Sequence, residues 1–234
     1  MIKLIFIFAI LVGITYGILF LLHFTIQRYK FIFDEEHIDL FFGLPGSGKT
    51  TLLADIVRQV LKKGHISVYT NMPIKGAYIL EKEDIGKYDF RQDGDSAALL
   101  LLDEGQTVYN CRNAMSKKES LRMTEQEIKF FCMHRHYKTQ VNAFSQGYED
   151  LDKIIRNRTY HIYYVTKSRI RGFIKVRRIA RIVDIENEQK QIVEGYEFER
   201  FSTRYVYGPK VWKMFDTYDC EPLPKKDAYK WYTQ

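Results

Sequence analysis

The sequence has few cysteines and no stretch of low complexity. Its three cysteines are scattered along 234 residues and form no C-x-x-C pair: Cys111, Cys132 and Cys220. An odd number at this spacing argues against a disulfide framework or a zinc site, and predicts reduced thiols. Hydrophobic residues make up 46% of the chain, so disorder is not the default. The length leaves room for one core domain and a small appendage.

Charge is absent from residues 4–22, LIFIFAILVGITYGILFLL, a segment long enough to cross a bilayer as a helix. A secretory signal has a shorter apolar region and a small-x-small cleavage site, and neither occurs in this segment. We therefore predict an uncleaved membrane anchor over residues 1–27 and a polar linker over residues 28–36. Lys3 precedes the span, while Arg28 and Lys30 follow it, which slightly favours a cytoplasmic carboxy-terminal side.

Residues 43–50, GLPGSGKT, match the pattern G-x-x-x-x-G-K-[ST] at every fixed position. An apolar run precedes this stretch, and apolar residues at helical spacing follow it up to Lys63, where Gly64 ends the predicted helix. In that context the glycine-rich turn, here called the P-loop, presents backbone N–H groups and a helix start to phosphate. The residues predicted to bind nucleotide are Gly43, Pro45, Gly46, Ser47, Gly48, Lys49, Thr50 and Thr51.

Two side chains of the P-loop have predicted roles in chemistry. Lys49 is expected to reach the β- and γ-phosphates, and Thr50 is expected to place its hydroxyl on Mg²⁺. Because cellular nucleotide is cytoplasmic, the P-loop also decides the expected orientation. The sequence therefore predicts a protein of the cytoplasmic membrane, crossing it once, with its nucleotide site inside the cell.

Residues 97–104, AALLLLDE, form a continuous apolar run that ends in two acids. A run without polar alternation is typical of a parallel strand buried on both faces, and ligands bind at the carboxyl ends of such strands. Asp103 is predicted to hold Mg²⁺ through water. Glu104 is predicted to polarise the attacking water, so we expect hydrolysis rather than binding alone.

Residues 138–144 are predicted to form a further strand, and Gln146 follows its tip. A polar residue there can touch the γ-phosphate or the attacking water, so Gln146 is the candidate sensor. The predicted fold is an α/β P-loop NTPase core over residues 37–165 with a mostly parallel sheet. At least one extra strand is expected between the P-loop strand and the acidic strand.

Acidic residues are absent from residues 153–183, which contain ten lysines or arginines. Lys167, Arg169 and Arg171 alternate, so we expect them to share one face of a strand, with Gly172 as a bend. The basic residues with interleaved aromatics suit single-stranded nucleic acid. Contact with the anionic inner leaflet and an ordinary solvated sheet edge are the alternatives. The candidate contact residues are Lys167, Arg169, Arg171, Lys175, Arg177 and Arg178. A β-rich extension is predicted over residues 166–220 and a tail over residues 221–234.

Four segments carry a resemblance to a known family: DEGQTVYNCR, HRHYKTQVNAFSQ, DLDKIIRNRT and KMFDTYD. With the P-loop they resemble the zonular occludens toxin family, which includes the assembly ATPases of filamentous phages. The resemblance covers about residues 37–219. It implies a membrane-embedded ATPase that uses ATP and Mg²⁺ to package phage single-stranded DNA and extrude the filament. It also implies a homo-oligomer that works with the phage coat protein.

The resemblance assigns the nucleotide site to Lys49, Thr50, Asp103 and Glu104, with Gln146 as the sensor. It also implies three candidates for an arginine finger: Arg112, Arg135 and Arg156. Better-known members place the membrane helix after the ATPase domain, whereas here it comes first, so the resemblance does not carry a toxin activity over to this chain. Two other functions stay open from the residues. One is a different membrane-tethered, DNA-translocating ATPase of the plasmid-transfer type, and the other is a nucleotide-gated assembly scaffold that does not hydrolyse.

Overall fold

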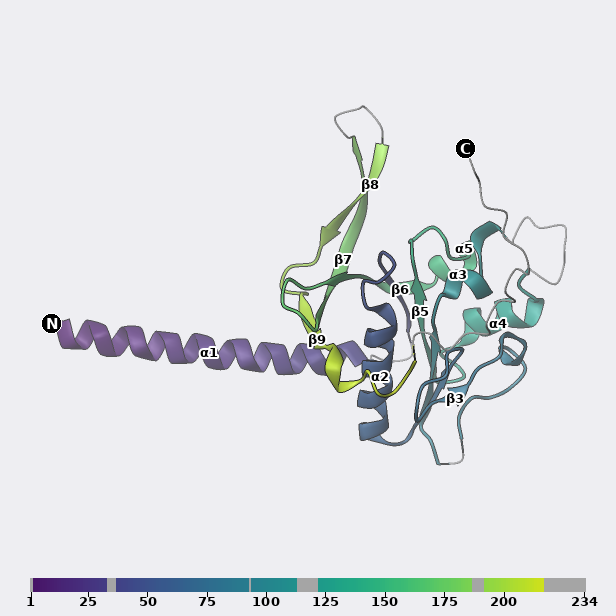
Figure 1. Ribbon diagram of the computed structural model, residues 1–234, viewed down its shortest axis with the longest axis horizontal. Coiled ribbons are helices and arrows are strands. Elements are labelled where there is room, and N and C mark those ends of the chain that lie inside the picture. Colours follow the sequence, from purple (N-terminus) through teal and green to yellow (C-terminus); the bar gives the residue numbers. More distant parts are fainter. Residues whose placement is uncertain (1, 33–36, 93, 113–121, 187–191, 217–234) are drawn as a thin grey trace, which may run out of the picture.

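A computed structural model describes residues 2–32, 37–92, 94–112, 122–186 and 192–216 (Figure 1). The strands are β1 (Ile38–Phe42), β2 (Ile66–Thr70), β3 (Tyr78–Ile79), β4 (Ala97–Leu102), β5 (Thr139–Ser145), β6 (Thr159–Lys167), β7 (Phe173–Glu186), β8 (Ile192–Phe198) and β9 (Arg204–Tyr207). The helices are α1 (Ile2–Ile32), α2 (Lys49–Lys63), α3 (Gly105–Val108), α4 (Glu125–Met133), α5 (Lys153–Arg156) and the short 3₁₀ helices η1 (Lys82–Asp84) and η4 (Gly208–Lys210). The expected tail at residues 221–234 and the last residues of KMFDTYD lie outside the described residues.

The strands form one mixed sheet in the order β3-β2-β4-β5-β1-β6-β7-β8, and β9 pairs with β7. Strands β1 to β6 pair in parallel, while β7, β8 and β9 pair antiparallel. Strand β5 lies between the P-loop strand β1 and the acidic strand β4, as the sequence predicts. The expected fold class, a mostly parallel P-loop NTPase sheet with additional carboxy-terminal strands, is confirmed.

Helices cover both faces of the central strands (Figure 1). On one face α2 contributes Leu52, Leu53 and Val57 to a cluster that also contains the β4 residue Leu101. On the other face α4 and α5 pack Phe131 and Ile155 against alternate residues of β4 and β5. All six residues of β4 are buried, because successive side chains of a strand enter opposite clusters. The continuous apolar run 97–102 is explained by this two-sided burial.

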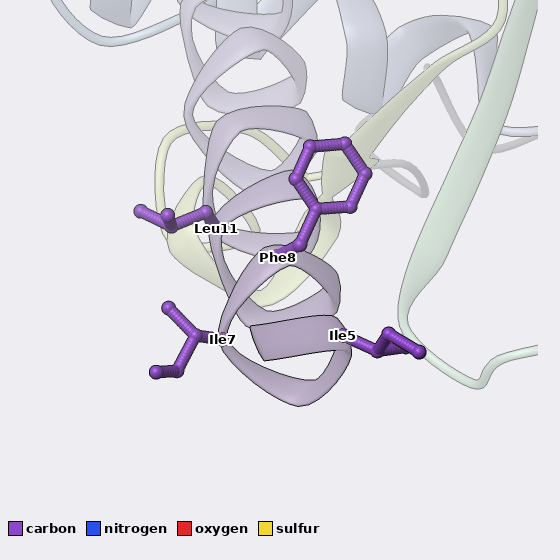
Figure 2. A pocket seen from close by; sticks show the side chains of 4 residues that line it. All are labelled: Ile5, Ile7, Phe8 and Leu11. Atoms are coloured by element: carbon purple, nitrogen blue, oxygen red, sulfur yellow. The ribbon is translucent and has the colours of Figure 1, made fainter. Parts of the chain in front are cut away.

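Helix α1 is longer than the predicted anchor. It spans Ile2–Ile32 and therefore includes residues 28–32, which were expected to belong to the linker. Those residues, RYKFI, contain no glycine or proline that would end a helix. The window Ile5–Leu22 is long and apolar enough to cross a membrane, and 0% of it is buried within the chain. Figure 2 shows Ile5, Ile7, Phe8 and Leu11 projecting outward from the helix.

The carboxy-terminal strands continue the core sheet. Strand β6 pairs with β1 and is followed by the β6–β7 hairpin, so the predicted division after residue 165 falls inside β6. Gly172, with φ +83°, is the expected bend. The expectation that Lys167, Arg169 and Arg171 share one strand face is wrong. Lys167 ends β6, whereas Arg169 and Arg171 lie in the turn before β7, where side chains do not alternate.

Helix α4 begins with the capping arrangement that the sequence TEQE indicates. Thr124 Oγ1 accepts a hydrogen bond from the Glu127 backbone N–H at 3.2 Å, and Glu127 Oε2 accepts one from the Thr124 N–H at 2.6 Å. The buried Tyr109 hydroxyl donates to Glu127 Oε1 at 2.9 Å. The cap therefore ties α4 to the segment that follows the acidic strand, and burial together with the Glu127 charge raises the pKa of Tyr109.

Replacing Thr124 with alanine should destabilise the protein by about 1 kcal/mol, because one donor of the first helical turn loses its acceptor. For a domain of this size the melting temperature should fall by about 2–4 °C. Thermal denaturation of the full-length protein in detergent measures the change. Thr124→Ser keeps the acceptor and serves as the control. Equal losses in both variants would show that the hydroxyl oxygen is not the stabilising group.

Candidate nucleotide-binding site

The P-loop connects the end of β1 to the start of α2. Gly46 and Gly48 have φ values of +72° and +100°, a region that favours glycine. Gly43 is needed for a different reason, because a Cβ added there would lie 2.2 Å from the Val165 carbonyl oxygen. The loop is therefore closely packed under β6. The Ser47 N–H donates to the Leu44 carbonyl at 3.0 Å, which closes the turn before the helix begins.

Lys49 lies inside this loop. Its Nζ donates to the carbonyl oxygens of Gly43 at 2.7 Å and Leu44 at 3.3 Å. The residue is 8% exposed, and burial lowers the pKa of the ammonium, while the charges of Asp103 and Glu104 oppose that shift. A desolvated cation held among backbone dipoles is suited to bind an anion strongly, since little water has to be displaced.

Thr50 and Asp103 form a hydrogen bond at the carboxyl edge of the sheet. Thr50 Oγ1 donates to Asp103 Oδ2 at 2.9 Å, although the residues are 53 positions apart. Asp103 Oδ1 accepts from the Glu104 N–H at 3.0 Å. The residue is 7% exposed, and burial raises the pKa of its carboxyl above the usual value, against the effects of the two hydrogen bonds.

These two residues fit a magnesium ion. A threonine hydroxyl and a carboxylate already in contact form the hard oxygen set that Mg²⁺ prefers, and Mg²⁺ keeps most of its waters. The loop also fits a phosphate, since Ser47 Oγ is buried and makes no hydrogen bond to any described residue. Both predicted ligand sets are therefore chemically sound at this edge of the sheet.

Asn71 is a site residue that sequence reasoning missed. It follows β2, and its side chain grips the Asp103 backbone twice: Nδ2 donates to the Asp103 carbonyl at 2.8 Å, and Oδ1 accepts from the Asp103 N–H at 2.7 Å. This clamp sets the position of the acidic residue. The signal in the sequence is a polar residue at the end of a strand, the same signal that selects Gln146.

Glu104 has φ 45° and ψ 48°, the left-handed conformation that a residue with a side chain rarely adopts. Its side chain is exposed. The Thr107 N–H donates to the Glu104 carbonyl at 2.7 Å and starts α3. Strain of this kind is concentrated at functional positions, because the surrounding structure must hold it in place.

Gln146 follows β5 directly, at the edge that carries the P-loop. The preceding residue is fixed, since Ser145 Oγ donates to the Gly147 carbonyl at 2.7 Å and the Gly43 N–H donates to the Ser145 carbonyl at 3.3 Å. Gln146 itself is exposed, and its side chain makes no hydrogen bond to a residue that the structure describes. It lies at the tip of β5, which pairs with the acidic strand β4, as the sequence analysis expects, and its role as a sensor stays a prediction.

The six candidate basic residues have different surroundings. Arg178 pairs with Glu199, which lowers the pKa of that carboxyl, and the guanidinium of Arg177 lies 3.5 Å from the centre of the Phe198 ring. Lys175 lies on β7 next to Thr166 of β6. Arg169 and Arg171 are exposed on the β6–β7 turn. Lys167 lies beside the P-loop: a Cβ added to Gly46 would lie 3.8 Å from Lys167 Nζ.

The three candidate arginines differ in their freedom. Arg156 is engaged within its own chain, where Nε donates to the Leu151 carbonyl at 3.0 Å and the guanidinium lies 5.3 Å from the centre of the Tyr148 ring. Arg112 is exposed in the segment that follows α3. Arg135 is exposed in the turn before β5, at the opposite edge of the sheet from the P-loop. Arg112 and Arg135 are therefore available to a neighbouring subunit.

The family model for zonular occludens toxin (Zot) matches residues 74–203. The chain belongs to the zonular occludens toxin family. The matched region includes the acidic strand and the β6–β7 hairpin and lies within the range expected from the sequence, while the P-loop precedes it. No curated protein matches the chain.

Several solved structures are similar to this member of the Zot family. The N-terminal domain of zonular occludens toxin from Neisseria meningitidis is 18% identical, with a TM-score of 0.49 over 78% of this chain and 100% of that chain. The genome packaging NTPase B204 from Sulfolobus turreted icosahedral virus 2, in complex with ATP-gammaS, is 13% identical, with a TM-score of 0.45 over 69% of this chain and 98% of that chain. A DnaB-like replicative helicase is 11% identical, with a TM-score of 0.43 over 69% of this chain and 55% of that chain.

Replacing Asp103 with asparagine should raise the melting temperature of the nucleotide-free protein. Because burial raises the pKa of this carboxyl, its charged form destabilises the fold at pH values above that raised pKa, and the cost decreases as the pH falls through it. A gain of about 1 kcal/mol corresponds to about 2–4 °C. Thermal denaturation of the full-length protein between about pH 5 and pH 8 should show the largest gain at the highest pH.

Asp89 provides the matched control for that measurement. Its hydrogen bond from Arg91 lowers the pKa of its carboxyl, so Asp89→Asn should give no stabilisation at any of these pH values. A melting temperature for Asp103→Asn that is unchanged or lowered at high pH would contradict the burial argument.

Proposed function

We propose that this member of the Zot family is a membrane-anchored ATPase that drives assembly and extrusion of filamentous phage virions. The observation that carries the proposal is the hydrogen bond between Thr50 and Asp103, with Lys49 buried in the adjoining loop. It brings together residues from distant parts of the sequence that form the two halves of the proposed Mg²⁺–nucleotide site. Family membership supports the phage-related context.

In the proposed reaction the P-loop amides and Lys49 bind the β- and γ-phosphates, and Thr50 and Asp103 hold Mg²⁺. Glu104 orients and polarises the attacking water. Its exposed side chain, next to the buried Asp103, supports a role in contacting water rather than metal. Gln146, at the tip of the intervening strand, is the proposed sensor of the γ-phosphate.

The proposed membrane anchor is the apolar part of α1. Its outward apolar side chains, four of which Figure 2 shows, have no cover within the described chain, and a bilayer would supply it. With the nucleotide in the cytoplasm, the ATPase domain would face the cytoplasm of the host cell. The proposed division into an ATPase core over residues 37–165 and a basic extension over residues 166–220 is a functional one, since the sheet itself continues through β6 across that boundary.

We further propose that the protein acts as a homo-oligomer with single-stranded DNA or its packaging complex and the phage coat protein. Arg112, which is exposed in the segment after α3, suits a role in a neighbouring subunit's site. Arg135 is the second candidate on grounds of exposure. Arg156 is the weakest, since its guanidinium is already bonded within the chain.

The proposal predicts an ATPase activity that depends on two residues in different ways. Lys49→Ala should abolish nucleotide binding, because the buried ammonium is lost. Glu104→Gln should keep nucleotide binding and lower kcat by about 10²–10⁴-fold, the usual effect of removing a general base. Phosphate release by the full-length protein in bilayer nanodiscs, with and without single-stranded DNA, measures both effects.

The same assay separates the alternative functions. A nucleotide-gated scaffold would bind ATP without turnover and tolerate Glu104→Gln. A plasmid-transfer ATPase would hydrolyse ATP, and adding filamentous phage coat protein to the assay would not change its rate. If the wild-type protein shows no ATP hydrolysis, or if its hydrolysis survives both Lys49→Ala and Glu104→Gln, the proposed enzyme is excluded.

DNA contact is a separate prediction that concerns the β6–β7 turn. Replacing Arg169 and Arg171 together with alanine should weaken single-stranded DNA binding and reduce its salt dependence by about 0.7 per lost phosphate contact. Titration of labelled oligonucleotide at several salt concentrations measures the slope. Lys62→Ala with Lys63→Ala removes the same charge from the last turn of α2 and is the control. An unchanged slope would point to lipid or protein as the partner of the turn.

A further inference from the structure

The β6–β7 hairpin packs against the P-loop. Strand β6 runs parallel to β1 with Tyr164 beside Phe42, so both strands reach the same edge of the sheet. Strand β1 ends there, whereas β6 continues to Lys167. The extra residues of β6 therefore extend beside the loop that follows Phe42.

Two buried contacts fix the hairpin against the loop on either side of Lys167. The Val165 carbonyl oxygen would lie 2.2 Å from a Cβ on Gly43, and Ile174 Cδ1 would lie 2.7 Å from a Cβ on Gly48. Lys167 pairs with Ile174 across the hairpin. Because Val165 and Ile174 are buried, the backbone of Lys167 has little freedom to move away from the P-loop.

The Lys167 side chain extends to the tip of the loop. Its Nζ would lie 3.8 Å from a Cβ on Gly46, and the residue is exposed. It forms no ion pair with any residue in the described ranges. The acids of the site, Asp103 and Glu104, instead act on Lys49. The P-loop thus has one lysine inside it and a second lysine outside its tip, and the second has no carboxylate partner among the described residues.

We propose that Lys167 is a second phosphate-binding lysine, which contacts the phosphate chain of a nucleoside triphosphate from outside the P-loop. This inference rests on the proposed function, since it needs a nucleotide in that loop. An ammonium that approaches a multiply charged phosphate chain forms charge-assisted hydrogen bonds, and their contribution grows with the number of phosphates. Lys167 therefore favours triphosphate over diphosphate, and contributes nothing to a monophosphate that ends short of the loop tip.

The test is the affinity of the full-length protein in detergent for fluorescent mant-ATP, mant-ADP and mant-AMP with Mg²⁺. Lys167→Ala should weaken mant-ATP binding about tenfold, weaken mant-ADP binding less and leave mant-AMP binding unchanged. Lys167→Arg, which keeps the charge, should recover most of the loss. Arg181→Ala removes the same charge from an exposed position further along β7 and should leave all three affinities at the wild-type value.

The outcomes separate this inference from the proposed function. If Lys49→Ala abolishes mant-ATP binding but Lys167→Ala matches Arg181→Ala, the nucleotide site stands and the inference is overturned. An equal loss for all three nucleotides would also overturn it, because a general structural defect does not depend on the number of phosphates. If Lys49→Ala binds all three nucleotides normally, the proposed function itself fails.

Discussion

A hydrogen bond between the Thr50 hydroxyl and the Asp103 carboxylate joins the start of α2 to the end of β4. Its formation depends on the order of the strands, because β5 separates β1 from β4 and the two residues must reach across its end. The Gly43 N–H is bonded to the end of β5, which fixes the P-loop on one side of that gap. The side chain of Asn71 fixes the Asp103 backbone on the other side. Four neighbouring strands, β2, β4, β5 and β1, thus place the Thr50 hydroxyl and the Asp103 carboxylate together.

The charged residues of the candidate site lower the stability of the folded protein. Lys49 and Asp103 are both buried. Burial lowers the pKa of Lys49 and raises the pKa of Asp103, so it favours the neutral form of each side chain. Glu104 adds a backbone conformation that is unfavourable for a residue with a side chain. The surrounding sheet can hold these groups in place because its core is apolar on both faces. Binding sites commonly sacrifice stability in this way, since a prearranged charged site binds its ligand without first having to reorganise.

The carboxy-terminal strands belong to this site as much as the conventional motifs do. Val165 and Ile174 pack on P-loop glycines, and η4 reaches the first turn of α2, where a Cβ on Gly208 would lie 3.2 Å from Thr51 Cγ2. A displacement of the P-loop or of the start of α2 would therefore also displace residues of β6, β7 and η4. The exposed Arg169 and Arg171 lie on the same hairpin. The hairpin that packs on the P-loop glycines therefore also carries the basic turn.

Much of the fold could be predicted from the sequence because its signals are local. The apolar run 97–102, the capping sequence TEQE and the glycine pattern of the P-loop each specify their own conformation through neighbouring residues. The inserted strand also agreed with expectation. The basic segment did not, since alternation alone cannot show that a strand ends at Lys167 and turns before Phe173.

The sequence by itself determined the P-loop, the acid-tipped buried strand, the apolar amino-terminal helix and the family. Only the tertiary structure decided that Asn71 clamps Asp103, that Arg178 is occupied by Glu199 and that Lys167 stands over Gly46. The physical reason is the distance along the sequence between the interacting residues. A local pattern is set by residues a few positions apart, whereas these contacts depend on which strands become neighbours and in which register they pair.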